Sequence, residues 1–166
     1  GVGINILPHA IRELETLGLL PALDVVGLRT RRLTYYTRSG QEVWSELRGT
    51  YAGHEVPQFS IHRGRLQHLL YTAVLDRLGP KAVQTGRRLG GFVQDDKGIT
   101  AHFANSIDGS KGITVRGDVL ICCDGIHSAG RKVFYPNEKS PSWNGVMMWR
   151  GAVEWPAWQD GESMAI

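Results

Sequence analysis

Apolar residues recur along the chain at two different spacings, which predict helices in some segments and strands in others. In residues 7–20, Ile11, Leu14 and Leu17 recur at about helical intervals, after Pro8 and before Gly18. Proline suits the first turn of a helix and glycine suits the position after its end. Residues 63–78 carry a longer helical stripe, formed by Leu66, Leu69, Leu70, Ala73, Val74 and Leu78. The pattern therefore predicts helices over 7–20 and 63–78.

Alternating apolar and polar positions predict strands elsewhere. Residues 32–47 read as a hairpin around Ser39 and Gly40, and residues 50–60 read as a loop. Three short extended runs are separated by turn residues and predict a β-meander; they cover 82–94, 99–104 and 112–116. Residues 162–166 resemble the middle of a strand.

The segment 118–123, "DVLICC", is apolar without alternation. This is typical of a strand buried on both faces of a parallel sheet. Residues 128–134 predict a short helix, and the polar, proline-containing segment 135–145 predicts a linker. A further strand with large side chains is predicted over 146–155. These elements divide the chain into domains 1–135 and 142–166.

The composition of the chain argues against a nucleic-acid-binding protein, a membrane-spanning protein and a metal site formed by cysteines. The chain has 166 residues, 42% of them hydrophobic, a net charge of +3 and a pI near 9.0. Basic residues gather at 28–32 and 86–88, but without a basic helix or basic–aromatic alternation, so these are read as solvated and nucleic-acid binding is not expected. The longest apolar run falls short of the ~18 residues of a membrane span. Adjacent Cys122 and Cys123 are too close for ordinary disulfide geometry, and no metal-ligand spacing occurs. Buried free thiols in the reducing cytoplasm are therefore expected.

Asp124 and Gly125 end the predicted buried strand and are the first candidates for chemistry. A carboxylate at the carboxyl edge of an α/β sheet lies where ligands bind, and it needs hydrogen-bond donors. Gly125 would allow a ligand close to the backbone. Ser128 is a suitable N-cap, and Arg131 could pair with Asp124 or meet a phosphate. The alternative is a strand–turn–helix in which Asp124 is an ordinary turn residue.

The segment 117–132, "GDVLICCDGIHSAGRK", resembles the DG motif of the FAD-dependent aromatic hydroxylases, the group A flavoprotein monooxygenases. Asp124, Gly125, Ser128 and Arg131 match the motif, which contacts FAD in that family and is implicated in NAD(P)H binding. His127 could help to hold the phosphates of a nicotinamide cofactor, or it could be an exposed loop residue. Gly130 stands where a β-branched residue is usual.

Two further segments resemble the same family in the same order. "GVGINILPHAIRELETLGL" resembles the glycine-containing turn that passes the flavin, with Gly3 and Ile4 as the close backbone positions. "SIHRGRLQHLL" resembles the segment whose arginine reaches FAD, which is Arg63 here. The likeness covers essentially the whole chain and is closest to the phenazine and salicylate-type hydroxylases. It implies an α/β fold: a partial FAD/NAD(P)-binding Rossmann-like domain with a β-meander, plus the start of a mixed-sheet substrate domain.

The resemblance implies an FAD-dependent monooxygenase that uses NAD(P)H and O2 to hydroxylate a small aromatic substrate. Met147 and Trp149 could line the substrate pocket or could serve packing. Another FAD oxidoreductase, such as an epoxidase or prenyl reductase, and a non-catalytic fragment are the alternatives. The family's GxGxxG and Gly-Asp motifs do not occur in the sequence. We therefore expect an internal fragment that, alone, binds FAD weakly and is inactive.

Overall fold

The computed structural model describes residues 2–109 and 111–166, and it forms two compact units. Unit 1 combines the chain up to Pro80 with Met148–Ile166, and unit 2 is Lys81–Met147. Both units mix short strands with helices, so the predicted α/β class is confirmed. The predicted division into domains 1–135 and 142–166 stays a prediction.

Unit 1 contains a three-stranded antiparallel sheet with the strand order β1-β5-β2. Its strands are β1 (Gly3–Ile6), β2 (Gly27–Arg29) and β5 (Phe59–His62). The tight glycine turn predicted at the start of the chain is wrong, because Gly3 and Ile4 lie in β1 and pair with His62 and Ile61. The glycines favour a turn locally, but pairing with β5, which lies far away in the sequence, holds this segment in an extended conformation.

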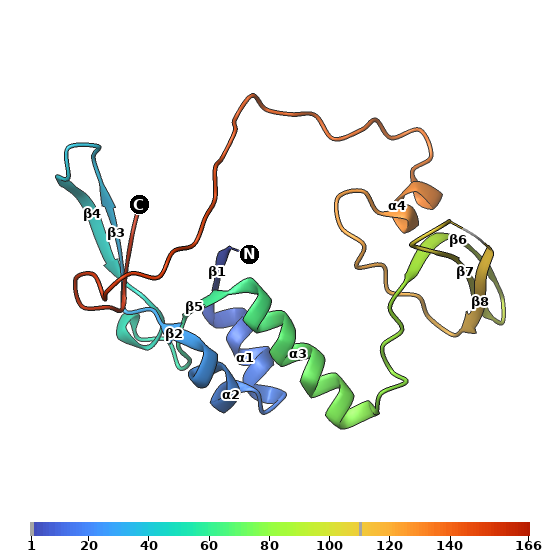
Figure 1. Cartoon of the computed structure of the whole chain (residues 1–166), viewed down its shortest axis with the longest axis horizontal. Coiled ribbons are helices and arrows are strands. Elements are labelled where there is room, and N and C mark those ends of the chain that lie inside the picture. Colours follow the sequence, from blue (N-terminus) through green and yellow to red (C-terminus); the bar gives the residue numbers. More distant parts are fainter. Residues whose placement is uncertain (1, 110) are drawn as a thin grey trace. The chain divides into compact units, whose positions relative to one another are not determined.

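Three helices lie side by side in unit 1, as Figure 1 shows. They are α1 (Pro8–Thr16), α2 (Leu20–Val26) and α3 (Arg63–Leu78). As predicted, α1 begins at Pro8 and is followed by Gly18 in the left-handed region, with φ +68°. α3 coincides with the predicted helix, and the side chain of its N-cap His62 accepts a hydrogen bond from the Gly64 N–H at 3.2 Å. This bond satisfies one of the N–H groups that the first turn of a helix leaves without a partner.

The core of unit 1 lies between this sheet and the helices. Its buried members are Ile6, Ile11, Leu23, Val56, Phe59 and Ile61. Leu66 and Leu69 of α3 pack against this cluster, whereas Leu78 at the end of α3 is 72% exposed. The N-terminal half of α3 thus holds the helix against the sheet.

The second sheet of unit 1 has the strand order β4-β3-β9. β3 (Arg32–Tyr36) and β4 (Glu42–Leu47) form the predicted hairpin, and β9 (Ser163–Ala165), also predicted, pairs in parallel with β3. The rings of Tyr35 and Trp44 lie across the hairpin with their centroids 5.8 Å apart. A short 3-10 helix, η1 (Gly49–Ala52), follows β4 and opens the predicted loop.

Unit 2 is built on the predicted β-meander. β6 (Arg87–Asp95), β7 (Gly98–Asn105) and β8 (Lys111–Gly117) pair antiparallel in that order. The predicted short helix, α4 (Ala129–Phe134), packs on β6, and the ring centroids of Phe92 and Phe134 are 5.4 Å apart. This packing fixes the residues around the start of α4 relative to the meander.

Two predicted strands are wrong. Residues 118–123 and 146–155 form neither helix nor strand, and within them Val119 and Trp149 are 76% and 91% exposed. A strand buried in a sheet needs neighbouring strands, and the described part of the chain supplies none that pairs with either run. The same lack of cover leaves the free thiols of Cys122 and Cys123 exposed, whereas the sequence predicts buried thiols.

A bidentate ion pair links the outer strands of the meander. The Arg116 guanidinium on β8 donates to both carboxylate oxygens of Asp95 on β6, at 2.5 and 2.8 Å, and to the Thr100 hydroxyl on β7 at 2.8 Å. The bond with Arg116, followed by one from the Lys97 N–H, lowers the pKa of Asp95 from 3.8 to about 2. The ionised carboxylate therefore favours the folded meander.

We expect the stability of unit 2 to fall as the pH drops from about 4 to about 2, because a carboxylate with a lowered pKa stabilises the fold only while it is ionised. Asp95→Asn should remove this contribution and flatten the pH profile over that range. Urea unfolding, followed by circular dichroism at several pH values, gives the free energy of unfolding as a function of pH. Asp96→Asn removes the same charge at the next, exposed position and serves as the control; equal profiles for the two variants would contradict the assignment.

Candidate functional site

Asp124 lies just before α4 and caps that helix. Its Oδ2 accepts hydrogen bonds from the Ala129 N–H at 2.6 Å and from the Gly130 N–H at 3.4 Å. A hydrogen bond with the Ser128 side chain, and then those backbone bonds, lower the pKa of Asp124 below its ordinary value. The carboxylate is therefore ionised at neutral pH, and it remains accessible at the surface of unit 2.

The turn between Asp124 and α4 is closed by its own backbone. Gly125 has φ +78°, a conformation that suits glycine, and its carbonyl accepts from the Ser128 N–H at 3.0 Å. Ser128 is the predicted N-cap, since its hydroxyl oxygen accepts from the Arg131 N–H at 2.9 Å. The motif thus forms a hydrogen-bonded turn that leads into α4, although the residues before it form no strand.

One interpretation of the sequence was that Arg131 pairs with Asp124. The structure does not show this pair. The Arg131 guanidinium instead forms an ion pair with Glu138, which follows the C-terminal end of α4. The Asp124 carboxylate is at the opposite end of this six-residue helix, where backbone N–H groups already satisfy it. The other possibility for Arg131, a contact with a phosphate, stays a prediction.

Asp124 and His127 open onto one hollow of about 950 Å³ within unit 2. Three cationic side chains share its lining: Arg87 and Arg88 from the start of β6 and Lys132 from α4. The hollow therefore combines one carboxylate, which accepts hydrogen bonds from hydroxyl groups, with several cations, which bind phosphate. This combination suits a ligand that carries both sugar hydroxyls and phosphates.

The sequence interpretation missed Arg87 and Arg88 as site residues. The basic cluster 86–88 is evident in the sequence, but its pattern predicts solvated side chains at a strand end. Charge patterning alone does not show that β6 begins beside the DG turn, because that proximity depends on how α4 packs on the meander. The basic residues could be seen in the sequence, but only the tertiary structure shows that they line the same hollow as Asp124.

The remaining predicted cofactor residues lie in unit 1. β1 pairs with β5, so Gly3 lies opposite His62, and the Arg63 N–H donates to the Val2 carbonyl at 3.0 Å. The structure thereby brings Gly3, Ile4 and Arg63 together at one end of the β1–β5 pair. Arg63 belongs to unit 1 and Asp124 to unit 2, and their roles as cofactor contacts stay predictions.

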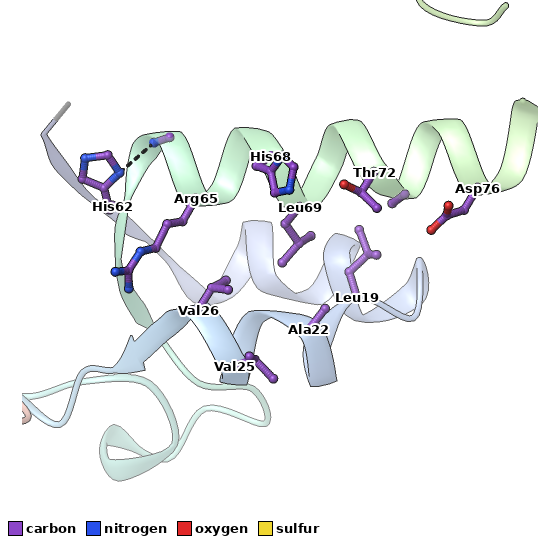
Figure 2. A pocket seen from close by; sticks show the side chains of 12 residues that line it. Leu19, Ala22, Val25, Val26, His62, Arg65, His68, Leu69, Thr72 and Asp76 are labelled. Carbon is purple, nitrogen blue, oxygen red and sulfur yellow. Dashed lines mark hydrogen bonds between the residues drawn. The ribbon is translucent and has the colours of Figure 1, made fainter. Parts of the chain in front are cut away.

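An apolar groove of about 870 Å³ runs between α2 and α3 near this region. Figure 2 shows Ala22, Val25 and Val26 of α2 on one wall and Leu69 of α3 on the other, with His62 at the end where α3 starts. Polar side chains, among them Arg65, His68 and Asp76, also line this groove.

Met147 and Trp149 lie in the irregular segment and are 70% and 91% exposed. The predicted strand that would carry them is absent from the described residues at 146–155. Their predicted role in lining a substrate pocket stays a prediction.

Residues 12–150 match the FAD binding domain family. The chain therefore belongs to that family. It is 40% identical over 166 residues to phenazine 1,6-dicarboxylic acid hydroxylase PhzS of Lysobacter antibioticus, covering all of this chain and 41% of that protein. It is 27% identical over 168 residues to FAD-dependent urate hydroxylase of Klebsiella pneumoniae, covering 93% of this chain and 38% of that protein.

A solved structure gives the same assignment. The crystal structure of Klebsiella pneumoniae HpxO complexed with FAD and uric acid is similar to this chain with a TM-score of 0.60 and 28% identity, over 80% of this chain and 32% of that one. The fold is thus that of an FAD-binding domain of flavin monooxygenases, and the chain spans about two fifths of the length of the curated relatives it matches.

Proposed function

We propose that the protein is an FAD-dependent monooxygenase that hydroxylates a small aromatic substrate with NAD(P)H and O2. The family match and the 40% identity over the whole chain to a phenazine hydroxylase support this activity. The observation that carries it is the hollow of unit 2, which joins the Asp124 carboxylate to the cations Arg87, Arg88 and Lys132. These groups fit a dinucleotide, which presents sugar hydroxyls and phosphates.

Each group would have a separate task toward the cofactors. Asp124 would accept hydrogen bonds from hydroxyl groups, and Gly125, with nothing within 4 Å of an added Cβ, leaves room for a close approach. His127, with the cations of the hollow, would hold phosphates of FAD or NAD(P)H. Ser128 and Arg131 would act through the turn, because the Ser128 hydroxyl holds the Arg131 N–H and shapes the start of α4.

In unit 1, the backbone at Gly3 and Ile4 and the Arg63 side chain would contact FAD. An added Cβ at Gly3 would meet its nearest neighbour, the Ile61 carbonyl oxygen, at 4.0 Å, so this face of β1 is open to a planar ring. FAD, when bound, would supply the redox chemistry with NAD(P)H and oxygen. The residues of this chain would bind and orient it.

The substrate would be a small aromatic molecule, and Met147 and Trp149 are the candidates to contact it. No helix within residues 2–109 and 111–166 is long and apolar enough to cross a bilayer. We place the protein in the cytoplasm, where NAD(P)H is available and where exposed thiols such as those of Cys122 and Cys123 stay reduced.

We expect Asp124→Ala to weaken the binding of FAD or NAD(P)H by about tenfold or more, because a charge-assisted hydrogen bond contributes ~1.5–3 kcal/mol. Flavin fluorescence quenching and NAD(P)H fluorescence titrations on the full chain measure this. Asp124→Asn keeps a capping acceptor for α4 and separates the loss of charge from the loss of the cap.

Asp118→Ala is the matched control, since Asp118 is an exposed acid of the same unit. Circular dichroism should show that all three variants keep their secondary structure. Unchanged flavin and NAD(P)H affinity in both Asp124 variants would reject the cofactor assignment.

A further inference from the structure

A second polar hollow, of about 430 Å³, lies within unit 1 and contains none of the predicted cofactor residues. Its walls come from the first turns of α1, the end of β4 and the η1 loop. Apolar side chains form part of the wall, and they are Leu7, Pro8, Leu47 and Ala52. The polar and charged residues of the lining outnumber these four, so a ligand of the hollow would need a polar group with a smaller apolar part.

The charged groups of this hollow favour an anion. Arg12 of α1 and Arg48 at the end of β4 line it together with one carboxylate, that of Glu46. Glu46 forms an ion pair with Arg48, so the lining residues offer no further carboxylate to Arg12. His54 adds an imidazole that donates a hydrogen bond in either neutral tautomer.

Arg48 is only partly satisfied within the protein. One terminal nitrogen contacts Glu46, while Nε is buried and has no hydrogen-bond partner among the described residues. A buried donor without an acceptor is unfavourable. An acceptor placed beside Nε would satisfy this donor, while the ion pair with Glu46 holds one terminal nitrogen.

Backbone geometry holds the floor of the hollow in place. Gln58 is 3% exposed, and its carbonyl accepts from the Thr30 N–H at 2.8 Å. Gly49 lies directly against it, since an added Cβ would overlap the Gln58 backbone nitrogen. The His54 N–H donates to the Gly49 carbonyl at 3.2 Å and closes the loop. These contacts hold the backbone that carries His54 and Gln58.

We propose that this hollow binds the carboxylate of a small organic acid. Guanidinium groups match a carboxylate in bidentate geometry, and the Gln58 amide and His54 imidazole supply neutral donors. The apolar wall then favours an organic acid over an inorganic anion, which has no apolar surface to bury. The site goes beyond the proposed cofactor chemistry, because none of its residues is assigned to FAD or NAD(P)H.

Fluorine NMR of a fluorobenzoate titrated with the full chain tests the site. Arg12→Gln and Arg48→Gln should each weaken binding at least tenfold. Arg12 is the safer variant for folding, since it is exposed on α1. Arg38→Gln, at an exposed position in the β3–β4 turn, removes the same charge elsewhere in unit 1 and should leave binding unchanged.

Two further titrations identify the ligand chemistry. A fluorobenzamide, which keeps the ring and lacks the charge, should bind at least tenfold more weakly than the acid. Inorganic phosphate should compete poorly. Absence of fluorobenzoate binding, equal binding of the amide, tighter binding of phosphate, or the same loss in Arg38→Gln would each overturn the proposal. The Asp124 titrations report on the cofactor sites independently, so the two proposals can fail separately.

Discussion

Replacing Phe59 with alanine is expected to destabilise unit 1 by about 3–5 kcal/mol, because truncating a buried phenylalanine removes its burial energy and leaves a cavity. Phe59 is fully buried in β5, the central strand of its sheet. An added Cβ at Gly27 on β2 would lie 2.9 Å from the ring, so the neighbouring strand packs closely against it. The Arg29 guanidinium covers the ring at 5.9 Å from its centroid.

The cavity in Phe59→Ala has little prospect of closing, since β5 is held by strands on both sides. Domains are stable by only ~5–15 kcal/mol, so this one change should remove a large part of the stability of unit 1. Urea unfolding followed by circular dichroism gives the free energy. Val43→Ala, at a position of β4 that is 65% exposed, should change it by no more than about 0.5 kcal/mol. A loss below ~1 kcal/mol in Phe59→Ala would show that this core is not closely packed.

Elements with both a periodic pattern and clear end signals could be predicted from the sequence. α3 has an apolar stripe that ends at Gly79, and α1 has Pro8 at its start and Gly18 after it. The hairpin and the meander were also found, because their strands pair with sequence neighbours across short turns. In these cases the information that forms the element lies within the element or next to it.

Elements that depend on distant partners could not be predicted. The apolar run 118–123 has the composition of a buried strand, but composition does not supply the strands that it would pair with. The reverse happened at Gly3, where a glycine-rich segment became β1 because β5 pairs with it. Pairing across such distances is a property of the whole fold.

The candidate site shows the same division between local and distant information. The capping role of Ser128 follows from its position before α4 and could be predicted from the sequence. The ion pair of Arg131 with Glu138 could not, because it requires the chain to turn back after α4. Arg87 and Arg88 join Asp124 in one hollow only through the packing of α4 on β6.

Gly49 and Gly53 allow a matched test of the frame around the polar hollow of unit 1. Both have positive φ, at +52° and +86°, so alanine at either position adopts an unfavourable left-handed conformation. That conformation costs roughly 1–2 kcal/mol for a residue with a Cβ. An added Cβ at Gly53 has nothing within 4 Å, whereas one at Gly49 would overlap the Gln58 nitrogen and lie 2.9 Å from the Pro57 carbonyl carbon.

Gly53→Ala should therefore show the conformational cost alone, while Gly49→Ala should cost about 1–3 kcal/mol more, because the backbone at Pro57 and Gln58 must move. That movement displaces the Gln58 amide, so Gly49→Ala should also weaken fluorobenzoate binding while Gly53→Ala leaves it nearly unchanged. Urea unfolding and the fluorine NMR titration measure the two effects on the same samples. If the two variants lose equal stability, the close contact between Gly49 and Gln58 does not exist in solution. If Gly49→Ala instead keeps full affinity despite the larger loss of stability, Gln58 is not a ligand of the hollow.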